Sequence, residues 1–115
     1  MAFNDLERKR VEKAAVAFVE KHRAPPQLRS KLDLAFRIDG QSLEIFEVSP
    51  RYDKPDEKLE IPVAKAKYVR SQDVWKVYWQ RADLKWHGYT PCPQVGTVEA
   101  FLELVGRDEM ACFFG

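Results

Sequence analysis

The segment VWKVYWQ, residues 74–80, alternates between two kinds of side chain along its length. Large apolar residues at 75, 77 and 79 are separated by a lysine, and then by a tyrosine. Successive side chains of a strand point to opposite faces of a sheet, so the pattern predicts a strand with one buried and one open face. We expect Trp75 and Trp79 to face the core and Lys76 and Tyr78 to face outward. All other face assignments depend on this one.

The strand at 74–80 is predicted to be the second half of a hairpin that spans residues 63–80. A two-residue loop at 72–73 sets Ala66 opposite Trp79, so that a small side chain meets a large one. A three-residue loop would instead turn lysines toward the buried face, which is expensive. An even-numbered loop is therefore expected.

An earlier hairpin is predicted over residues 31–48. Asp39-Gly40 is a strong tight-turn signal, and a two-residue loop there sets Phe36 opposite Leu43. The charged, proline-bounded residues 49–62 are expected to form a long loop.

Residues 84–89, LKWHGY, can return as a fifth strand with Trp86 near Trp79. The open face would then carry lysines, tyrosines and a histidine from three strands. These candidate binding residues are Lys65, Lys67, Lys76, Tyr78, Lys85, His87 and Tyr89. Ammonium groups interleaved with rings are typical of single-strand binding, where cations track phosphates and rings stack on bases. The alternative is an ordinary solvated face, on which Glu44 neutralises a nearby lysine.

Two helices are predicted, one near each end of the chain. Residues 4–22 begin at Asn4, with Glu7 placed to complete a capping box. Residues 97–106 begin at Thr97 and end at Gly106, a residue suited to a left-handed terminus. The apolar stripe of the first helix is Leu6, Val11, Ala14, Ala15, Phe18 and Val19.

These elements predict an α+β fold. An antiparallel meander sheet of four to five strands carries the N-terminal and the C-terminal helix packed on one face, the face of Trp75 and Trp79. At 115 residues the chain is expected to form a single domain, residues 1–115. The terminal Phe113-Phe114 pair is expected to dock against the body.

Composition narrows the classes of partner. The net charge is +1, but residues 63–89 hold six basic and two acidic side chains, whereas residues 32–62 hold four and eight. This excludes a globally basic nucleic-acid binder and leaves room for a local basic patch. With no export signal and no long apolar segment, we expect a cytoplasmic protein without a membrane partner, whose Cys92 and Cys112 stay reduced.

Catalytic constellations are not recognisable in the sequence. No phosphate loop, nucleophile elbow or metalloprotease helix is present, and the two cysteines and two histidines lack zinc-finger spacing. We therefore expect no metal and no cofactor. Asp33, Glu44 and Glu47, with a lysine on a neighbouring strand, loosely resemble a magnesium-dependent nuclease core, but the acid-x-lysine triplet is absent.

The stretch PVAKAKYVRSQDVWKVYWQRADLKWHGY (62–89), with the opening MAFNDLERKRVEK and the ending ACFFG, resembles the small bacterial family called domain of unknown function 3024. The resemblance runs along the whole chain. It implies a bacterial, cytoplasmic protein of one domain, and it supplies no catalytic or binding residues.

Three functions stay open at this point. The first is a non-enzymatic interaction module that binds a protein or self-associates, because Phe46, Val48 and Tyr78 are expected on an otherwise charged face. The second is single-stranded nucleic-acid binding through the lysines of the open face. The third is a degenerate metal-dependent nuclease, which needs Asp33, Glu44 and a lysine close together.

Overall fold

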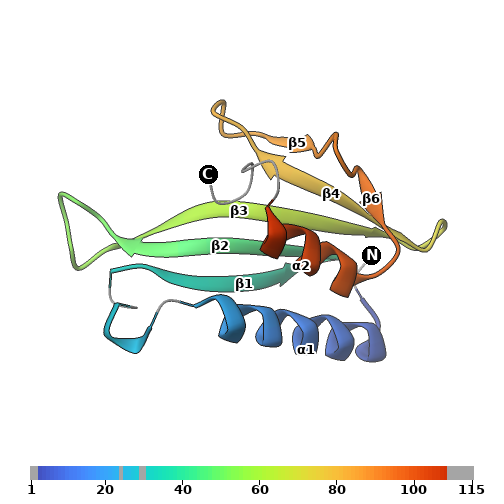
Figure 1. The fold of residues 1–115 in the computed structure, drawn as a ribbon, viewed down its shortest axis with the longest axis horizontal. Helices are drawn as coiled ribbons and strands as arrows, with labels where there is room; N and C mark the ends of the chain where they lie inside the picture. Colours follow the sequence, from blue (N-terminus) through green and yellow to red (C-terminus); the bar gives the residue numbers. More distant parts are fainter. Residues whose placement is uncertain (1–2, 24, 29–30, 109–115) are drawn as a thin grey trace.

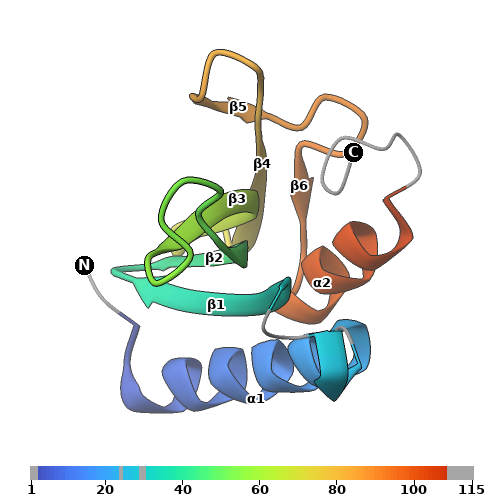
Figure 2. The same ribbon diagram turned by 90° about the vertical axis from the view of Figure 1, so that its left-hand side faces the viewer.

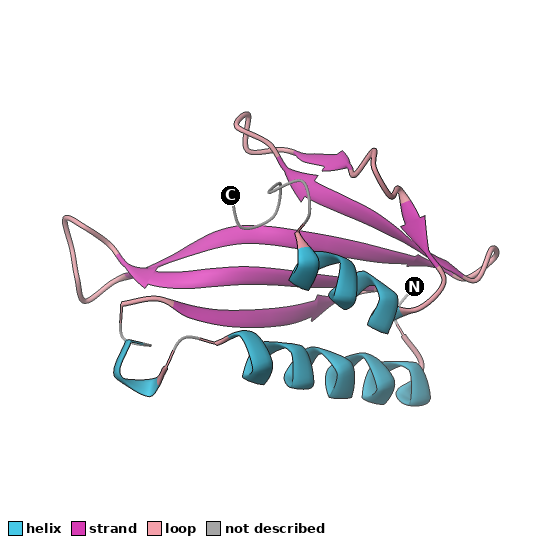
Figure 3. Cartoon of the chain, in the orientation of Figure 1, coloured by secondary structure: helices cyan, strands magenta, loops and turns pink. Residues whose placement is uncertain are grey.

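The computed structural model describes residues 3–23, 25–28 and 31–108. It is an α+β fold in which two helices cover one face of an antiparallel sheet, as predicted (Figures 1 and 3). The elements are α1 (Asp5–His22), η1 (Pro26–Leu28), β1 (Asp33–Asp39), β2 (Ser42–Pro50), β3 (Lys58–Val69), β4 (Val74–Gln80), β5 (Trp86–Gly88), β6 (Gln94–Val95) and α2 (Val98–Arg107). Phe113, Phe114 and Cys112, for which the sequence predicts docking and a reduced thiol, lie outside the described residues.

The strands follow one another in the order β1-β2-β3-β4-β5, and β6 also pairs with β4. The meander is therefore confirmed, and the short β6 is an addition to it. In Figure 2 both helices lie on the same side of the sheet, while β4 and β5 turn out of the plane of β1 to β3. We call the side that carries α1 and α2 the helix face and the other side the open face.

The helix starts agree with the sequence. The Asn4 side chain accepts from the Glu7 amide at 2.8 Å, and the Glu7 carboxylate accepts from the Asn4 amide at 2.9 Å. Thr97 caps α2 by accepting from the amide of Ala100 at 3.1 Å. Leu6 was expected in the apolar stripe of α1, but it is 81% exposed, because it lies five residues before the buried Val11 and so about 140° around the helix from it.

The end of α2 differs from the prediction. The left-handed residue is Asp108, with φ of 40°, and Gly106 lies inside the helix. A Cβ added at Gly106 would lie 3.2 Å from Nε2 of His22. Gly106 is thus placed where α1 and α2 approach each other closely, rather than at a helix terminus.

Both hairpin loops have an even number of residues, as predicted, but the residues that form them differ from the prediction. Asp39 pairs with Ser42, so the first turn is centred on 40–41 instead of 39–40. Val69 pairs with Val74, so the β3–β4 loop has four residues, 70–73, instead of two. Both shifts move the register by an even number of positions, and every side chain keeps its predicted face.

The long loop predicted for residues 49–62 is mostly strand. β2 runs on to Pro50 and β3 begins at Lys58, so the connection is only 51–57. The register shifts between Ile45 and Phe46, where Ala64 and Pro62 are the partners and Val63 is the extra residue of a bulge. A proline is tolerated at such a bulge, which is why Pro62 does not end the strand.

The core lies between the helices and the sheet. Val11, Ala15 and Phe18 of α1 and Val98, Phe101, Leu102 and Val105 of α2 meet a sheet surface that includes Leu43, Ile45, Ala64, Ala66, Trp75 and Val77. Trp75 is 6% exposed, and Trp79 is partly buried against the same cluster. The predicted facing of the two indoles is confirmed. In the described part of the chain, no helix is both long and apolar enough to cross a membrane.

Candidate functional site

The open face carries a group of cationic and aromatic side chains on β3, β4 and β5. We call Lys65, Lys67, Lys76, Tyr78 and Trp86 the lysine face. Lys67 lies directly opposite Lys76, and Lys65 lies directly opposite Tyr78. Four of the seven residues predicted for this face are therefore brought together as expected.

Among the described residues, no acidic side chain forms an ion pair with these lysines. Throughout the described residues the ion pairs are made by arginines and by His87, and no lysine takes part in one. Glu44 lies directly opposite Lys65 in the sheet, beside a lysine as the sequence predicted, but its ion pair is with Arg37, at 3.5 Å. Arg37 also binds Glu60, and hydrogen bonding to Glu60 raises the pKa of the guanidinium. The acids of the open face are thus held by an arginine.

The predicted register set Trp86 near Trp79, which would turn Trp86 to the buried side, and this register is wrong. Trp86 pairs with Gln80, so it points to the open face, and the Lys65 ammonium lies 5.9 Å from the centre of its ring. Lys65 and Trp86 come from β3 and β5, whose backbones are separated by about 10 Å because β4 runs between them. Their side chains therefore converge above β4.

The parity of the fifth strand explains where the other three predicted residues lie. The β4–β5 connection covers the five residues 81–85, with Leu84 at φ of 63°. His87 faces the helix side opposite Trp79, and its Nε2 lies 2.9 Å from Oδ2 of Asp83. Hydrogen bonding to His87 lowers the pKa of Asp83.

Lys85 and Tyr89 also leave the lysine face. Lys85 lies exposed in the β4–β5 connection, before the strand begins. Tyr89 is 2% exposed, and its amide donates to the carbonyl of Val77 at 2.9 Å. Since Val77 faces the core, its cross-strand neighbour Tyr89 does too. Placing Tyr89 on an open binding face was an error of register.

The apolar residues expected to attract a partner are less accessible than predicted. Phe46 does face the open side, but it is only 7% exposed, because the guanidinium of Arg37 lies 4.3 Å from the centre of its ring. Val48 and Tyr78 are half-buried. The open face therefore exposes less apolar surface than the sequence suggested.

The acids of the hypothetical nuclease core are not brought together. Asp33 pairs in register with Val48, and Glu44 pairs with Arg37, four positions further along β1. That separation corresponds to about 13 Å of strand. Asp33 is instead held by Arg23, with two hydrogen bonds of 2.9 and 2.8 Å, and Glu47 faces the helix side opposite Leu34. Burial raises the pKa of Glu47. Among the described residues, no three metal-ligating side chains form a cluster.

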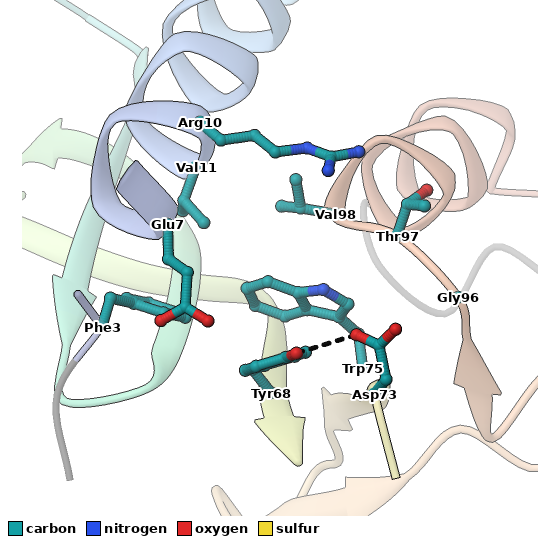
Figure 4. A pocket seen from close by; sticks show the side chains of 10 residues that line it. All are labelled: Phe3, Glu7, Arg10, Val11, Tyr68, Asp73, Trp75, Gly96, Thr97 and Val98. Atoms are coloured by element: carbon teal, nitrogen blue, oxygen red, sulfur yellow. Dashed lines mark hydrogen bonds between the residues drawn. The ribbon is translucent and has the colours of Figure 1, made fainter. Parts of the chain in front are cut away.

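A second feature is a cavity of about 190 Å³ on the helix face, between the first turns of α1 and α2 and the β3–β4 loop (Figure 4). We call it the aromatic pocket. Trp75 lies at its centre, 5.5 Å from Phe3 and 5.2 Å from Tyr68 between ring centres. The remaining lining residues are Glu7, Arg10, Val11, Asp73, Gly96, Thr97 and Val98.

The charged groups of the aromatic pocket are mostly paired. Arg70 binds Glu7 at 2.7 Å, and this hydrogen bond lowers the pKa of the Glu7 carboxyl. Arg10 donates to both carboxylate oxygens of Glu99, at 3.2 and 3.0 Å, which lowers the pKa of Glu99. Asp73 accepts a hydrogen bond of 2.8 Å from the hydroxyl of Tyr68, and the pKa of that phenol is raised.

Sequence reasoning missed the aromatic pocket because its lining comes from four separate segments. Phe3, Tyr68 and Trp75 meet only once the N-terminal residues pack across the end of the β3–β4 hairpin. The odd-numbered side chains of β4 did signal a ring facing inward at 75. Nothing in their spacing indicated that a cavity would remain beside it.

Comparison with known protein families identifies one family whose model matches the chain. The model of a family described as "Domain of unknown function (DUF3024)" matches residues 3–115. No curated protein and no solved structure matches the chain.

Proposed function

Because the chain belongs to the DUF3024 family, whose description assigns no activity, we propose a function from the geometry alone: the lysine face binds single-stranded nucleic acid. The observation that carries the proposal is the placement of Lys67 directly opposite Lys76. Like charges in this position destabilise a sheet, and in the described part of the chain no carboxylate pairs with either lysine. A phosphate bound between the two would remove the repulsion.

The aromatic members of the face favour a single strand over a duplex. A ring can stack only on a base whose face is free, and bases are unstacked in single strands. Trp86 lies beside Lys65, so one nucleotide can place its base on the indole and its phosphate near the ammonium. Tyr78, opposite Lys65, offers a second ring and a hydroxyl donor.

The expected affinity is modest and depends on salt. Three lysines release about three counterions, which for a single strand gives a slope of log K against log salt of about −2. Binding of this size is of the non-specific class, with a dissociation constant of about 10⁻⁴ to 10⁻⁶ M at physiological salt.

Fluorescence anisotropy of labelled DNA and RNA single strands tests the proposal. We expect Lys67→Gln to weaken binding and to lower the salt slope by about 0.7, the contribution of one phosphate contact. Trp86→Leu should weaken binding at every salt concentration and leave the slope unchanged, because stacking releases no counterion. Lys13→Gln, on the exposed side of α1, is the matched control and should bind as the unmodified protein does. Absence of binding at low salt, or an equal loss in the control, contradicts the proposal.

A second proposal keeps self-association but moves its surface away from Phe46, Val48 and Tyr78: a second copy of the chain covers part of the β2–β3 hairpin at Leu59 and Ile61. The observation in its favour is that Leu59 and Ile61 of β3, two positions apart and so on one face, are 46% and 44% exposed. Light scattering over a range of concentrations tests it. A monomer at all concentrations, with no change on Ile61→Lys, counts against self-association.

A further inference from the structure

The aromatic pocket contains bonding groups that the described residues leave unused. Trp75 is 6% exposed, yet its indole N–H makes no hydrogen bond within the described part of the chain. In Figure 4 the indole nitrogen lies on the edge of the ring that faces the first turn of α2. Among the described residues the only buried side-chain nitrogen or oxygen without a partner is Nε2 of Gln41, so the Trp75 indole N–H is open to water, and a ligand oxygen that replaces this water can accept from it.

The charge of the aromatic pocket is unbalanced by one negative unit. Glu7 is compensated by Arg70, and Arg10 is compensated by Glu99. Asp73 accepts only from the neutral hydroxyl of Tyr68, and no ion pair joins it to a cation among the described residues. The unmatched carboxylate at the rim therefore favours a cationic ligand.

The walls indicate what kind of cation fits. The rings of Phe3, Tyr68 and Trp75 pack against one another, with centres 5.2–6.4 Å apart, and together they line part of the space; ring faces attract cations, quaternary ammonium groups above all. A primary ammonium would need acceptors for three N–H groups, whereas a quaternary ammonium has none to satisfy. A cavity of about 190 Å³ is also smaller than the roughly 300–1,000 Å³ sites that hold drug-sized ligands. The ligand is thus a single small headgroup.

We propose that the aromatic pocket binds a quaternary ammonium group that carries an oxygen atom a few bonds away, as choline does. The ammonium lies against the ring of Trp75 beside the carboxylate of Asp73, and the oxygen accepts from the Trp75 indole. This site is independent of the lysine face, because the two lie on opposite faces of the sheet.

Isothermal titration with choline tests the proposal, and 3,3-dimethylbutan-1-ol is the control ligand because it has the same shape without the charge. We expect the neutral compound to bind at least about tenfold more weakly, since it lacks the cation–π and carboxylate attraction. The indole N–H resonance of Trp75 should shift on addition of choline. Equal binding of the two compounds, or no binding of choline in solution or as the headgroup of phosphatidylcholine vesicles, overturns the proposal. Binding to vesicles alone assigns the site to a lipid headgroup, and binding in solution assigns it to the free amino alcohol.

The decisive variant is Asp73→Asn. Asp73 has φ of 51°, a conformation that asparagine tolerates well, and the amide oxygen can still accept from Tyr68. The substitution therefore removes the charge and keeps the turn, which an unchanged melting temperature would confirm. We expect choline to bind at least about fivefold more weakly, whereas Asp56→Asn in the exposed 51–57 connection should have no effect. Unchanged choline binding by Asp73→Asn refutes the assigned role of the carboxylate.

Discussion

Replacing Lys76 by glutamate should make the protein more stable and a weaker binder of nucleic acid. Lys76 lies directly opposite Lys67, and the change turns a repulsive cross-strand pair into an attractive one. Two ammonium groups that spread to about 8 Å in water repel by about 0.5 kcal/mol, and reversing one charge changes the pair energy by about twice that amount. The expected gain is therefore about 1 kcal/mol at low ionic strength, close to the upper range of cross-strand pairs.

Urea unfolding followed by circular dichroism measures this gain. At physiological ionic strength the Debye length is about 8 Å, so screening should reduce the gain to about 0.4 kcal/mol. Lys13→Glu, which makes the same charge change on the exposed side of α1, controls for net charge and should leave stability within about 0.5 kcal/mol. Oligonucleotide affinity should fall in Lys76→Glu and stay unchanged in the control.

If Lys67 and Lys76 bind nucleic acid together, Lys76→Glu should raise the free energy of unfolding and lower the affinity for oligonucleotides. If the two lysines are merely exposed, the substitution should change the stability alone. If Lys76→Glu destabilises the protein at low salt, the two lysines do not repel each other as the register implies. If it stabilises the protein and leaves oligonucleotide binding intact, the repulsion is real, but nucleic acid is not what relieves it.

Three further predictions concern the fold. Gly106→Ala should raise the free energy of unfolding by about 0.5–1 kcal/mol in a thermal melt, because alanine favours the helix and the exposed His22 ring, 3.2 Å from the new Cβ, can move aside. Partial desolvation of the ring beside α2 lowers the pKa of His22 below its ordinary value of 6.5, so its neutral form favours the folded state. This contribution is fully present above pH 6.5 and is lost as the pH falls through the folded pKa, and His22→Gln should flatten urea-unfolding stability over that window. Val77→Ala, at a site with 0% exposure, should cost about 2–3 kcal/mol in the same assay.

The sequence was a reliable guide to faces wherever strands joined through even-numbered loops. The β3–β4 loop proved to be four residues long instead of two, yet Trp75 and Lys76 kept their predicted sides, because an even shift preserves the period of the strand. The helix caps at Asn4 and Thr97 were equally predictable, since capping depends only on residues within one turn.

The fifth strand could not be placed in the same way. Its connection has an odd number of residues and is closed by Leu84 in a left-handed conformation that leucine rarely adopts, so no local signal indicates it. As a consequence, Trp86 lies on the open face and Tyr89 on the helix face, the reverse of the predicted arrangement. An error of one residue thus moved a ring onto the lysine face and took another away from it.

The aromatic pocket lies beyond any local pattern, because it depends on long-range packing. Phe3 and Trp75 are 5.5 Å apart in space and far apart in the chain. The aromatic pocket can therefore be recognised as a candidate binding site only from the three-dimensional structure.

The three indole N–H resonances provide the most direct test of the central claim that the lysine face binds a single strand. Trp86 lies on that face beside Lys65, whereas Trp75 and Trp79 lie on the helix side. In a two-dimensional NMR titration with a single-stranded oligonucleotide, the Trp86 resonance should shift progressively and the Trp75 resonance should stay in place. A titration that moves Trp75 and leaves Trp86 unchanged, or that moves neither, contradicts the account.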